Sequence, residues 1–270
     1  MLKIFKDELS NPKNFVVTLG QGPSKEKMIF RNGPGFVIPV CDSTMDLAWS
    51  LYGQGRFPEF AWVMAHNQTR ARGRLARTWV TEPGSLAVTL RLPATAENLG
   101  PLVSMATALA LVRALSDIDV TAGIKWPNDI LVHGRKAGGI LIEEKQGVFM
   151  AGIGVNIGKA PENSVMEHFF HLPAGCLNIS GVGLDLFDIW GGILEKIQDR
   201  FPAMTADPTA AVREVNAVLA WKNETVVLAH TGIHDGPAIV LGVDLQGRLK
   251  VRTTKGIACI QSGTLYPRVT

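Results

Sequence analysis

One pentapeptide, Lys125-Trp126-Pro127-Asn128-Asp129, sets a cation, an aromatic ring, an amide and a carboxylate next to one another. Residues 120–124 before it read as a short strand. The proline has no backbone N–H to give to a sheet ladder, so strand pairing should lapse there and leave the polar side chains to bind a ligand. A second interpretation has equal weight: the segment also suits a turn in which the asparagine and aspartate bond their own backbone and the tryptophan fills the core.

A group of arginines lies upstream of this pentapeptide. Four of them fall within positions 70–77, with Gly73 among them and Trp79 after them. Guanidinium groups bind carboxylates and phosphates through paired hydrogen bonds, so a local arginine cluster suits a small polyanion. Because a glycine and a tryptophan are interleaved with the charges, an ordinary solvated basic face is the weaker interpretation.

Two glycine-containing segments follow the pentapeptide. They read Arg135-Lys136-Ala137-Gly138-Gly139-Ile140-Leu141-Ile142-Glu143 and Gly152-Ile153-Gly154-Val155-Asn156-Ile157. Glycine on a strand lets a ligand or another backbone approach closely. Taken alone, Lys136 would be an ordinary loop lysine, and Asn156 could be a core amide with its hydrogen bonds satisfied.

In this order, the four motifs resemble the catalytic region of the biotin protein ligases. That family has an arginine–glycine loop that closes on a tryptophan, a Lys-Trp-Pro-Asn-Asp pentapeptide, a Lys-x-x-Gly-Ile-Leu-x-Glu strand and a Gly-x-Gly-x-Asn strand. The resemblance covers roughly residues 36–160 by motif and, more loosely, the chain to its end. It implies an ATP-dependent ligase that converts biotin to biotinyl-5'-AMP and transfers it to a lysine of a biotin carboxyl carrier protein.

The resemblance also implies roles for individual residues. The catalytic group would be Lys136, Arg72 and Arg74. The residues expected to bind biotin are Ser43, Thr44, Gln68, Arg72, Gly73, Arg74, Lys136, Gly138, Gly139 and Gly152. Those expected to bind ATP or the adenylate are Arg72, Arg74, Arg77, Trp79, Lys125, Asn128, Asp129 and Asn156. Mg²⁺ is expected with the nucleotide, near Asp129, but the sequence does not assign its ligands.

Three residues depart from the family pattern. Ala71 and Ala76 stand where the family loop usually has glycines, which predicts an altered loop geometry. Met45 stands where many members have Asn after the Ser-Thr pair, which predicts one hydrogen bond fewer to biotin. The retained arginines and tryptophan favour retained adenylation.

Composition limits the remaining function classes. The 270 residues are 46% hydrophobic with a formal net charge of +3, which suits a soluble protein with one main domain and a smaller one. No lysine run marks a DNA-binding surface, and no segment is long enough to be a signal peptide or a membrane span. Three well-separated cysteines indicate neither a disulfide framework nor a zinc site. We therefore expect a cytoplasmic protein that binds neither DNA nor a membrane.

Hydrophobic periodicity predicts the elements that position the motifs. A helix should follow Ser43 or Thr44, and further helices should lie at 102–115, 184–201 and 210–221. Strands are expected at 36–40, 60–65, 85–92, 123–126, 130–132, 139–144 and 148–157. This order predicts an α+β fold, a mixed sheet with helices on one face. The resemblance implies the class II synthetase-like catalytic domain of biotin ligases.

The pattern changes near residue 220. Short strands separated by turns follow, at 226–229, 238–243, 249–253 and 257–260. They predict a small barrel, which the resemblance identifies as an SH3-like domain. We expect an irregular lead-in at 1–35, too short for a DNA-binding module, a catalytic domain at 36–220 and a C-terminal domain at 221–270.

Two other functions stay open. One is a lipoate or octanoate ligase or transferase of the related fold, which the pentapeptide and the barrel disfavour. The other is a non-catalytic biotin-binding or regulatory protein, which the retained Lys136 disfavours. The natural carrier protein stays open, and a homodimer is one option for the oligomeric state.

Overall fold

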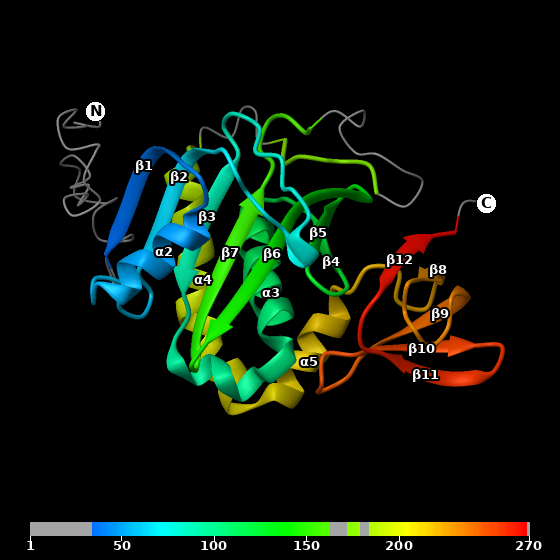
Figure 1. Ribbon diagram of the computed structural model, residues 1–270. Helices are drawn as coiled ribbons and strands as arrows, with labels where there is room; N and C mark the ends of the chain where they lie inside the picture. Colours follow the sequence, from blue (N-terminus) through cyan, green and yellow to red (C-terminus); the bar gives the residue numbers. More distant parts are fainter. Residues whose placement is uncertain (1–33, 162–171, 179–183, 269–270) are drawn as a thin grey trace.

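Two β-sheets organise the computed structural model, which describes residues 34–161, 172–178 and 184–268 (Figure 1). The larger sheet has seven strands in the order β1-β2-β3-β7-β6-β5-β4, and the smaller has five in the order β11-β10-β9-β8-β12. The expected lead-in falls almost entirely on residues 1–33, outside the described residues.

The seven-stranded sheet is mixed, because β1 runs parallel to β2 and the other neighbours are antiparallel. Its strands are β1 (Gly35–Cys41), β2 (Trp62–Gln68), β3 (Leu86–Arg91), β4 (Ala122–Lys125), β5 (Asp129–Val132), β6 (Arg135–Lys145) and β7 (Val148–Val155). The helices are α2 (Thr44–Gly53), α3 (Val103–Ser116), α4 (Leu186–Ala206) and α5 (Pro208–Ala217), with 3₁₀ turns η3 (Arg74–Ala76) and η4 (Ala94–Leu102).

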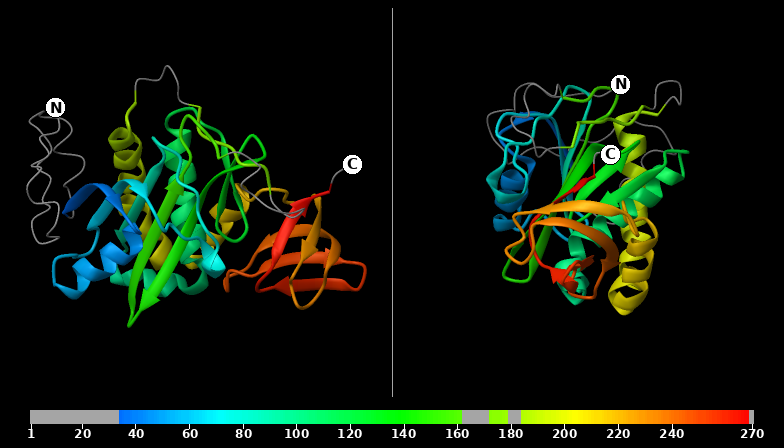
Figure 2. Two further views of the ribbon diagram at one scale, coloured as in Figure 1. Left: turned by 45° about the horizontal axis from the view of Figure 1, so that its top comes forward. Right: turned by 90° about the vertical axis from the view of Figure 1, so that its right-hand side faces the viewer.

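Helices lie on both faces of this sheet, as the edge-on view in Figure 2 shows. The expected arrangement holds for α3 and α4, which cover one face and form the larger apolar core with it. Helix α2 packs on the opposite face with a second core. Residues along β1 alternate between the two cores, since Phe36 and Ile38 belong to the second and Val37 to the first. Helix α2 therefore lines the face that α3 and α4 leave uncovered.

One stretch of the described chain is long and apolar enough to cross a membrane, Ala94–Ser116. In the fold, 72% of its apolar window is buried. Gly100, with a φ of 49°, makes a kink inside η4, and α3 follows directly after η4. The stretch thus packs as the central core segment of the larger domain.

The five-stranded sheet is antiparallel throughout and consistent with the expected SH3-like domain. Its strands are β8 (Thr225–Ala229), β9 (Gly236–Val243), β10 (Leu249–Thr253), β11 (Gly256–Ile260) and β12 (Thr264–Pro267). The last strand was not expected from the sequence. The division at residue 220 stays a prediction, since α5 ends at Ala217 and the next strand begins at Thr225.

Candidate active site

A buried carboxylate lies between two lysines where β5 meets β4 and β6. Asp129 Oδ2 is 2.8 Å from Lys125 Nζ, and Asp129 Oδ1 is 2.6 Å from Lys136 Nζ. Burial alone would raise the pKa of Asp129, but the two ammonium groups hold it below its usual value. The Lys125 and Asp129 side chains are 7% and 10% exposed, whereas that of Lys136 is 30% exposed. This lysine–aspartate cluster carries one surplus positive charge, and Lys136 is the member that solvent reaches.

The pentapeptide combines both interpretations that its sequence left open. Trp126 is 1% exposed and donates from Nε1 to the Gly247 carbonyl at 2.8 Å, so it fills the core and joins the two domains. The Lys125 ammonium is buried and pairs with the Asp129 carboxylate. Asn128 donates to the Ile140 carbonyl at 2.7 Å and lies toward the arginine loop. Lys125 therefore forms an ion pair within the protein, and its phosphate contact stays a prediction.

A stripe of glycines on β6 and β7 forms a surface without side chains. Gly139 and Gly154 are cross-strand partners beneath Trp79. A Cβ on Gly154 would come within 2.9 Å of the indole ring, and one on Gly139 within 3.5 Å. Gly152 continues the same face, where a Cβ would lie 3.1 Å from the Met45 side chain. This glycine stripe, Gly139, Gly152 and Gly154, lets the indole lie against the sheet, with Lys136 Nζ 5.6 Å from its ring centre.

Two glycines of β6 and β7 differ from what the motifs suggested. Gly154 was not among the expected site residues, although its spacing from Gly152 puts both on one face of a strand. Gly138 was expected to admit biotin, but it points to the opposite face of β6. A Cβ there would lie 2.8 Å from the Gly154 carbonyl and 3.4 Å from Ile130. Close packing within the sheet therefore explains Gly138.

An unpaired acceptor lies at the end of β7. Asn156 is 3% exposed, and its Nδ2 donates to the Gly175 carbonyl at 2.9 Å. Its Oδ1 has no hydrogen-bond partner within the described part of the chain. A buried acceptor without a donor is costly, so this atom suits a ligand that brings an N–H group. The exocyclic amine of adenine is such a group, and the adenylate-binding role of Asn156 stays a prediction.

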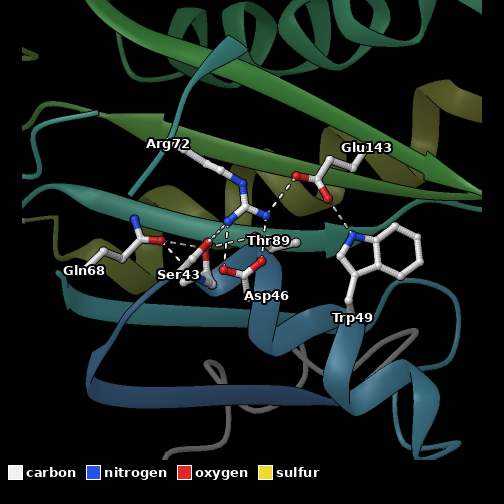
Figure 3. A network of polar contacts seen from close by, with 8 residues as sticks. Ser43, Asp46, Trp49, Gln68, Arg72, Thr89 and Glu143 are labelled. Carbon is white, nitrogen blue, oxygen red and sulfur yellow. Dashed lines mark hydrogen bonds and ion pairs between the residues drawn. The ribbon is translucent and has the colours of Figure 1, made fainter. Parts of the chain in front are cut away.

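Hydroxyl and amide groups gather at the start of α2 (Figure 3). Gln68 Oε1 accepts from the Thr44 backbone N–H at 2.8 Å and from its hydroxyl at 3.1 Å. Thr89 donates to the same Thr44 hydroxyl at 2.9 Å. Ser43 precedes the helix, but its side chain makes no capping bond and lies 3.4 Å from Arg72 Nη1. Thr89 was not expected from the sequence, although a polar residue on an otherwise apolar strand could have indicated it.

The arginine loop is a small hairpin. The Trp79 N–H bonds the Ala71 carbonyl at 3.0 Å, and the Gly73 N–H bonds the Arg77 carbonyl at 2.8 Å. Leu75 adopts the left-handed conformation at the tip, with a φ of 56°. The loop therefore closes at its base even though Ala71 replaces a glycine there.

The three expected arginines of this loop differ in their partners. Arg74 and Arg77 are exposed, and neither has a carboxylate partner among the residues that the structure describes. Arg74 Nη1 is 3.4 Å from Asn128 Oδ1. Arg72 instead bonds two carboxylates, those of Asp46 and Glu143 (Figure 3). Arg72 is therefore paired within the protein, whereas Arg74 and Arg77 keep exposed guanidinium groups.

The described residues do not form a cage for Mg²⁺. They contain no group of three His, Cys, Asp or Glu side chains placed to hold a metal ion. Both oxygens of Asp129, the expected neighbour of the metal, already bond lysines. We therefore assign no catalytic step to a protein-bound metal.

Burial raises the pKa of the Cys41 thiol to about 12, so this thiol is no nucleophile at neutral pH.

Known proteins resemble this chain in both sequence and fold. Residues 37–159 match the Biotin/lipoate A/B protein ligase family. A biotin--[acetyl-CoA-carboxylase] ligase of Paracoccus denitrificans is 31% identical over 76% of this chain and 90% of its own length. The bifunctional ligase/repressor BirA of Bacillus subtilis is 28% identical over 84% of this chain and 71% of its own length.

A solved structure has the same arrangement of elements. The biotin protein ligase of Aquifex aeolicus, in complex with biotin and ATP, superposes with a TM-score of 0.71 over 87% of this chain and 99% of its own, at 23% identity. This likeness supports the fold, and the Paracoccus relative supports the family. The chain belongs to the biotin protein ligases of the Biotin/lipoate A/B protein ligase family.

Proposed function

We propose that this protein joins biotin to ATP, forming biotinyl-5'-AMP, and then transfers biotin to a lysine of a biotin carboxyl carrier protein. The observation that carries the proposal is the Lys136 ammonium, which Asp129 fixes at 2.6 Å beside Trp79 and the glycine stripe. An immobilised cation at a side-chain-free surface suits a reaction between two anions.

The first step must overcome repulsion between a carboxylate and a triphosphate. A biotin carboxylate oxygen attacks the α-phosphorus of ATP, and the bond from that phosphorus to the pyrophosphate oxygen breaks. Lys136 and the exposed Arg74 and Arg77 supply positive charge to the two reactants and to the departing pyrophosphate. In the second step the acceptor amine attacks the acyl carbon, AMP leaves, and the amine loses a proton.

Two groups of residues bind the ends of the adenylate. On the biotin side, Ser43, Thr44 and Gln68 offer hydrogen bonds to the ureido group, and the bonds between Thr44 and Gln68 fix the orientation of those two side chains. On the nucleotide side, Asn156 Oδ1 accepts from the adenine amine, and Trp79 lies against the glycine stripe. A few polar groups at fixed positions give a mostly apolar ligand its orientation.

The name of a relative supports the proposed partner, and the needs of the reaction support the proposed location. The Paracoccus protein is named for acetyl-CoA carboxylase, so the carrier domain of that enzyme is the proposed acceptor. We propose a cytoplasmic location, where ATP and the unmodified carrier are both present. Mg²⁺ accompanies ATP in this scheme and is held by the phosphates.

The test incubates the full chain with biotin, ATP, MgCl₂ and an unmodified carrier domain, and reads labelling by intact mass spectrometry. We expect one biotin per carrier, and none on a carrier whose acceptor lysine is replaced by arginine. Labelling with lipoate but not with biotin would identify a lipoate ligase. Biotin binding without any transfer would identify a non-catalytic binding protein.

A further inference from the structure

Arg72 of the arginine loop forms a polar network with Asp46, Trp49 and Glu143 (Figure 3). Arg72 donates from Nη1 and Nη2 to the two oxygens of Asp46, at 2.7 and 2.6 Å. Its Nη2 also donates to Glu143 Oε1 at 3.0 Å, and Trp49 Nε1 donates to Glu143 Oε2 at 2.8 Å. Asp46 and Trp49 lie on α2, and Glu143 lies on β6. The paired geometry with Asp46 is the strongest form of an arginine–carboxylate contact.

The charges of this group leave no cation for a substrate. One guanidinium faces two carboxylates, and the bond from Arg72 holds the pKa of Asp46 below its usual value, so Asp46 stays ionised at neutral pH. Lys145 lies near, 4.4 Å from the Trp49 ring centre, and its ammonium only brings the sum to zero. A biotin carboxylate or a phosphate that approached Arg72 would have to displace a carboxylate already bound there.

The contacts also join the loop to both walls of the site. Arg72 directly follows Ala71, whose carbonyl accepts the hydrogen bond that closes the hairpin at Trp79. Asp46 belongs to the first turn of α2, next to the Ser43–Thr44 pair. Glu143 belongs to the strand that carries Lys136 and Gly139. Through Arg72, the loop is therefore bonded to the helix on the biotin side and to the strand on the nucleotide side.

We propose that Asp46 and Glu143 are positioning residues that hold Arg72 as an internal tether, so that Arg72 fixes the arginine loop over the adenylate and does not itself bind the substrate anions. This inference rests on the proposed function for its kinetic consequence. It also replaces the direct catalytic role that the sequence suggested for Arg72. Trp49 supports the tether by orienting Glu143.

The direction of the change in KM distinguishes a tether from a direct ligand. The variant is Asp46→Asn combined with Glu143→Gln, which removes two negative charges and leaves Arg72 in place. A tether predicts a KM for ATP and for biotin about tenfold higher and a biotinyl-AMP release about tenfold faster, with kcat changed less than threefold. A direct ligand predicts the opposite, because a released guanidinium and a less negative site would bind the anions equally well or more tightly.

A matched control exists at α3 and α4, on the sheet face opposite α2. Asp117 is 59% exposed, as Asp46 is, and lies 2.7 Å from Lys196 at the end of α3. Asp117→Asn removes a similar surface ion pair and should leave both KM values unchanged. Trp49→Phe keeps both carboxylates and an aromatic ring near Lys145 and removes the bond to Glu143, so it should raise the KM for ATP by about threefold.

Hydrogen–deuterium exchange of the ligand-free protein tests the tether without relying on activity. In the double variant, the amides of Gly73 and Trp79, which close the hairpin, should exchange at least tenfold faster than in the wild type, with exchange in α3 unchanged. Unchanged protection of these amides would overturn the tether. Faster exchange in a protein that makes no biotinyl-AMP would support the tether and reject the proposed function.

Discussion

Two ionic clusters of the site have opposite charge balances. In the lysine–aspartate cluster, one carboxylate lies between two ammonium groups and is buried. In the Arg72 tether, one guanidinium lies between two carboxylates and is half exposed. The first therefore has a surplus cation, Lys136, and the second has none. The partners of a basic residue, more than its type or its motif, determine whether it is available to a substrate.

The largest expected effect comes from removing the surplus cation. Lys136→Ala should slow single-turnover formation of biotinyl-AMP by about 10²- to 10³-fold, because one preorganised charge is lost from the transition state. Quenched-flow measurement with saturating biotin and ATP gives this rate. The matched control is Lys196→Ala, because Lys196 is 29% exposed and 2.7 Å from its own carboxylate partner. Equal rates in the two variants would remove Lys136 from the mechanism.

Removing the shared carboxylate tests the other half of the same cluster. Asp129→Asn leaves the buried Lys125 ammonium without its counter-charge, and such a change costs about 3–5 kcal/mol. Urea unfolding should show a loss of stability of this size. A loss below about 1 kcal/mol, as expected for an exposed pair such as Asp117–Lys196, would contradict the burial that distinguishes the two clusters.

A substitution in the glycine stripe tests the role of Trp79 by steric means and should have a smaller effect than the loss of Lys136. Gly154→Ala places a methyl group 2.9–3.0 Å from the Trp79 ring, so the indole must move. We expect the KM for ATP to rise about tenfold, which corresponds to about 1.4 kcal/mol. Gly192→Ala in α4 is the control, because a Cβ there meets nothing within 4 Å. An unchanged KM for the first variant would show that Trp79 does not contact the nucleotide.

The smallest expected effect is a difference between the wild type and Asp129→Asn in how Tm depends on pH. The folded-state pKa of Asp129 is lowered, so its stabilisation is present above the ordinary aspartate pKa and is lost as pH falls through the folded value. Between about pH 5 and pH 2, the Tm of the wild type should fall more steeply than that of Asp129→Asn. Parallel Tm curves for the two proteins would show that Asp129 keeps an ordinary pKa in the fold.

Local pattern predicted most of the elements. The apolar run at 102–115 became α3 at Val103–Ser116, because a long apolar segment without internal Pro or Gly has one stable conformation in a core. The strand at 139–144 was predicted too short, since β6 starts at Arg135. The place of α2 on the opposite face and the position of β7 at the centre of the sheet depend on long-range packing, which periodicity does not encode.

The candidate site shows the same limit. Lys136, Asn156 and the Ser43–Thr44 pair could be proposed from motifs alone. The pairing of Arg72 with two carboxylates could not be proposed in this way, because Asp46 and Glu143 lie 26 and 71 positions away in sequence. Trp126 was compatible with both a ligand wall and a core residue, and its burial and its contact with Gly247, in the turn between β9 and β10, decide between them.

One product analysis tests the central claim, that the site joins the biotin carboxylate to the α-phosphate of ATP. The full chain is mixed with one equivalent each of biotin and ATP, without a carrier, and the quenched products are separated by chromatography. We predict one equivalent of biotinyl-AMP and of pyrophosphate per site, formed only when biotin is present. Formation of ADP, or release of pyrophosphate independent of biotin, would contradict the account.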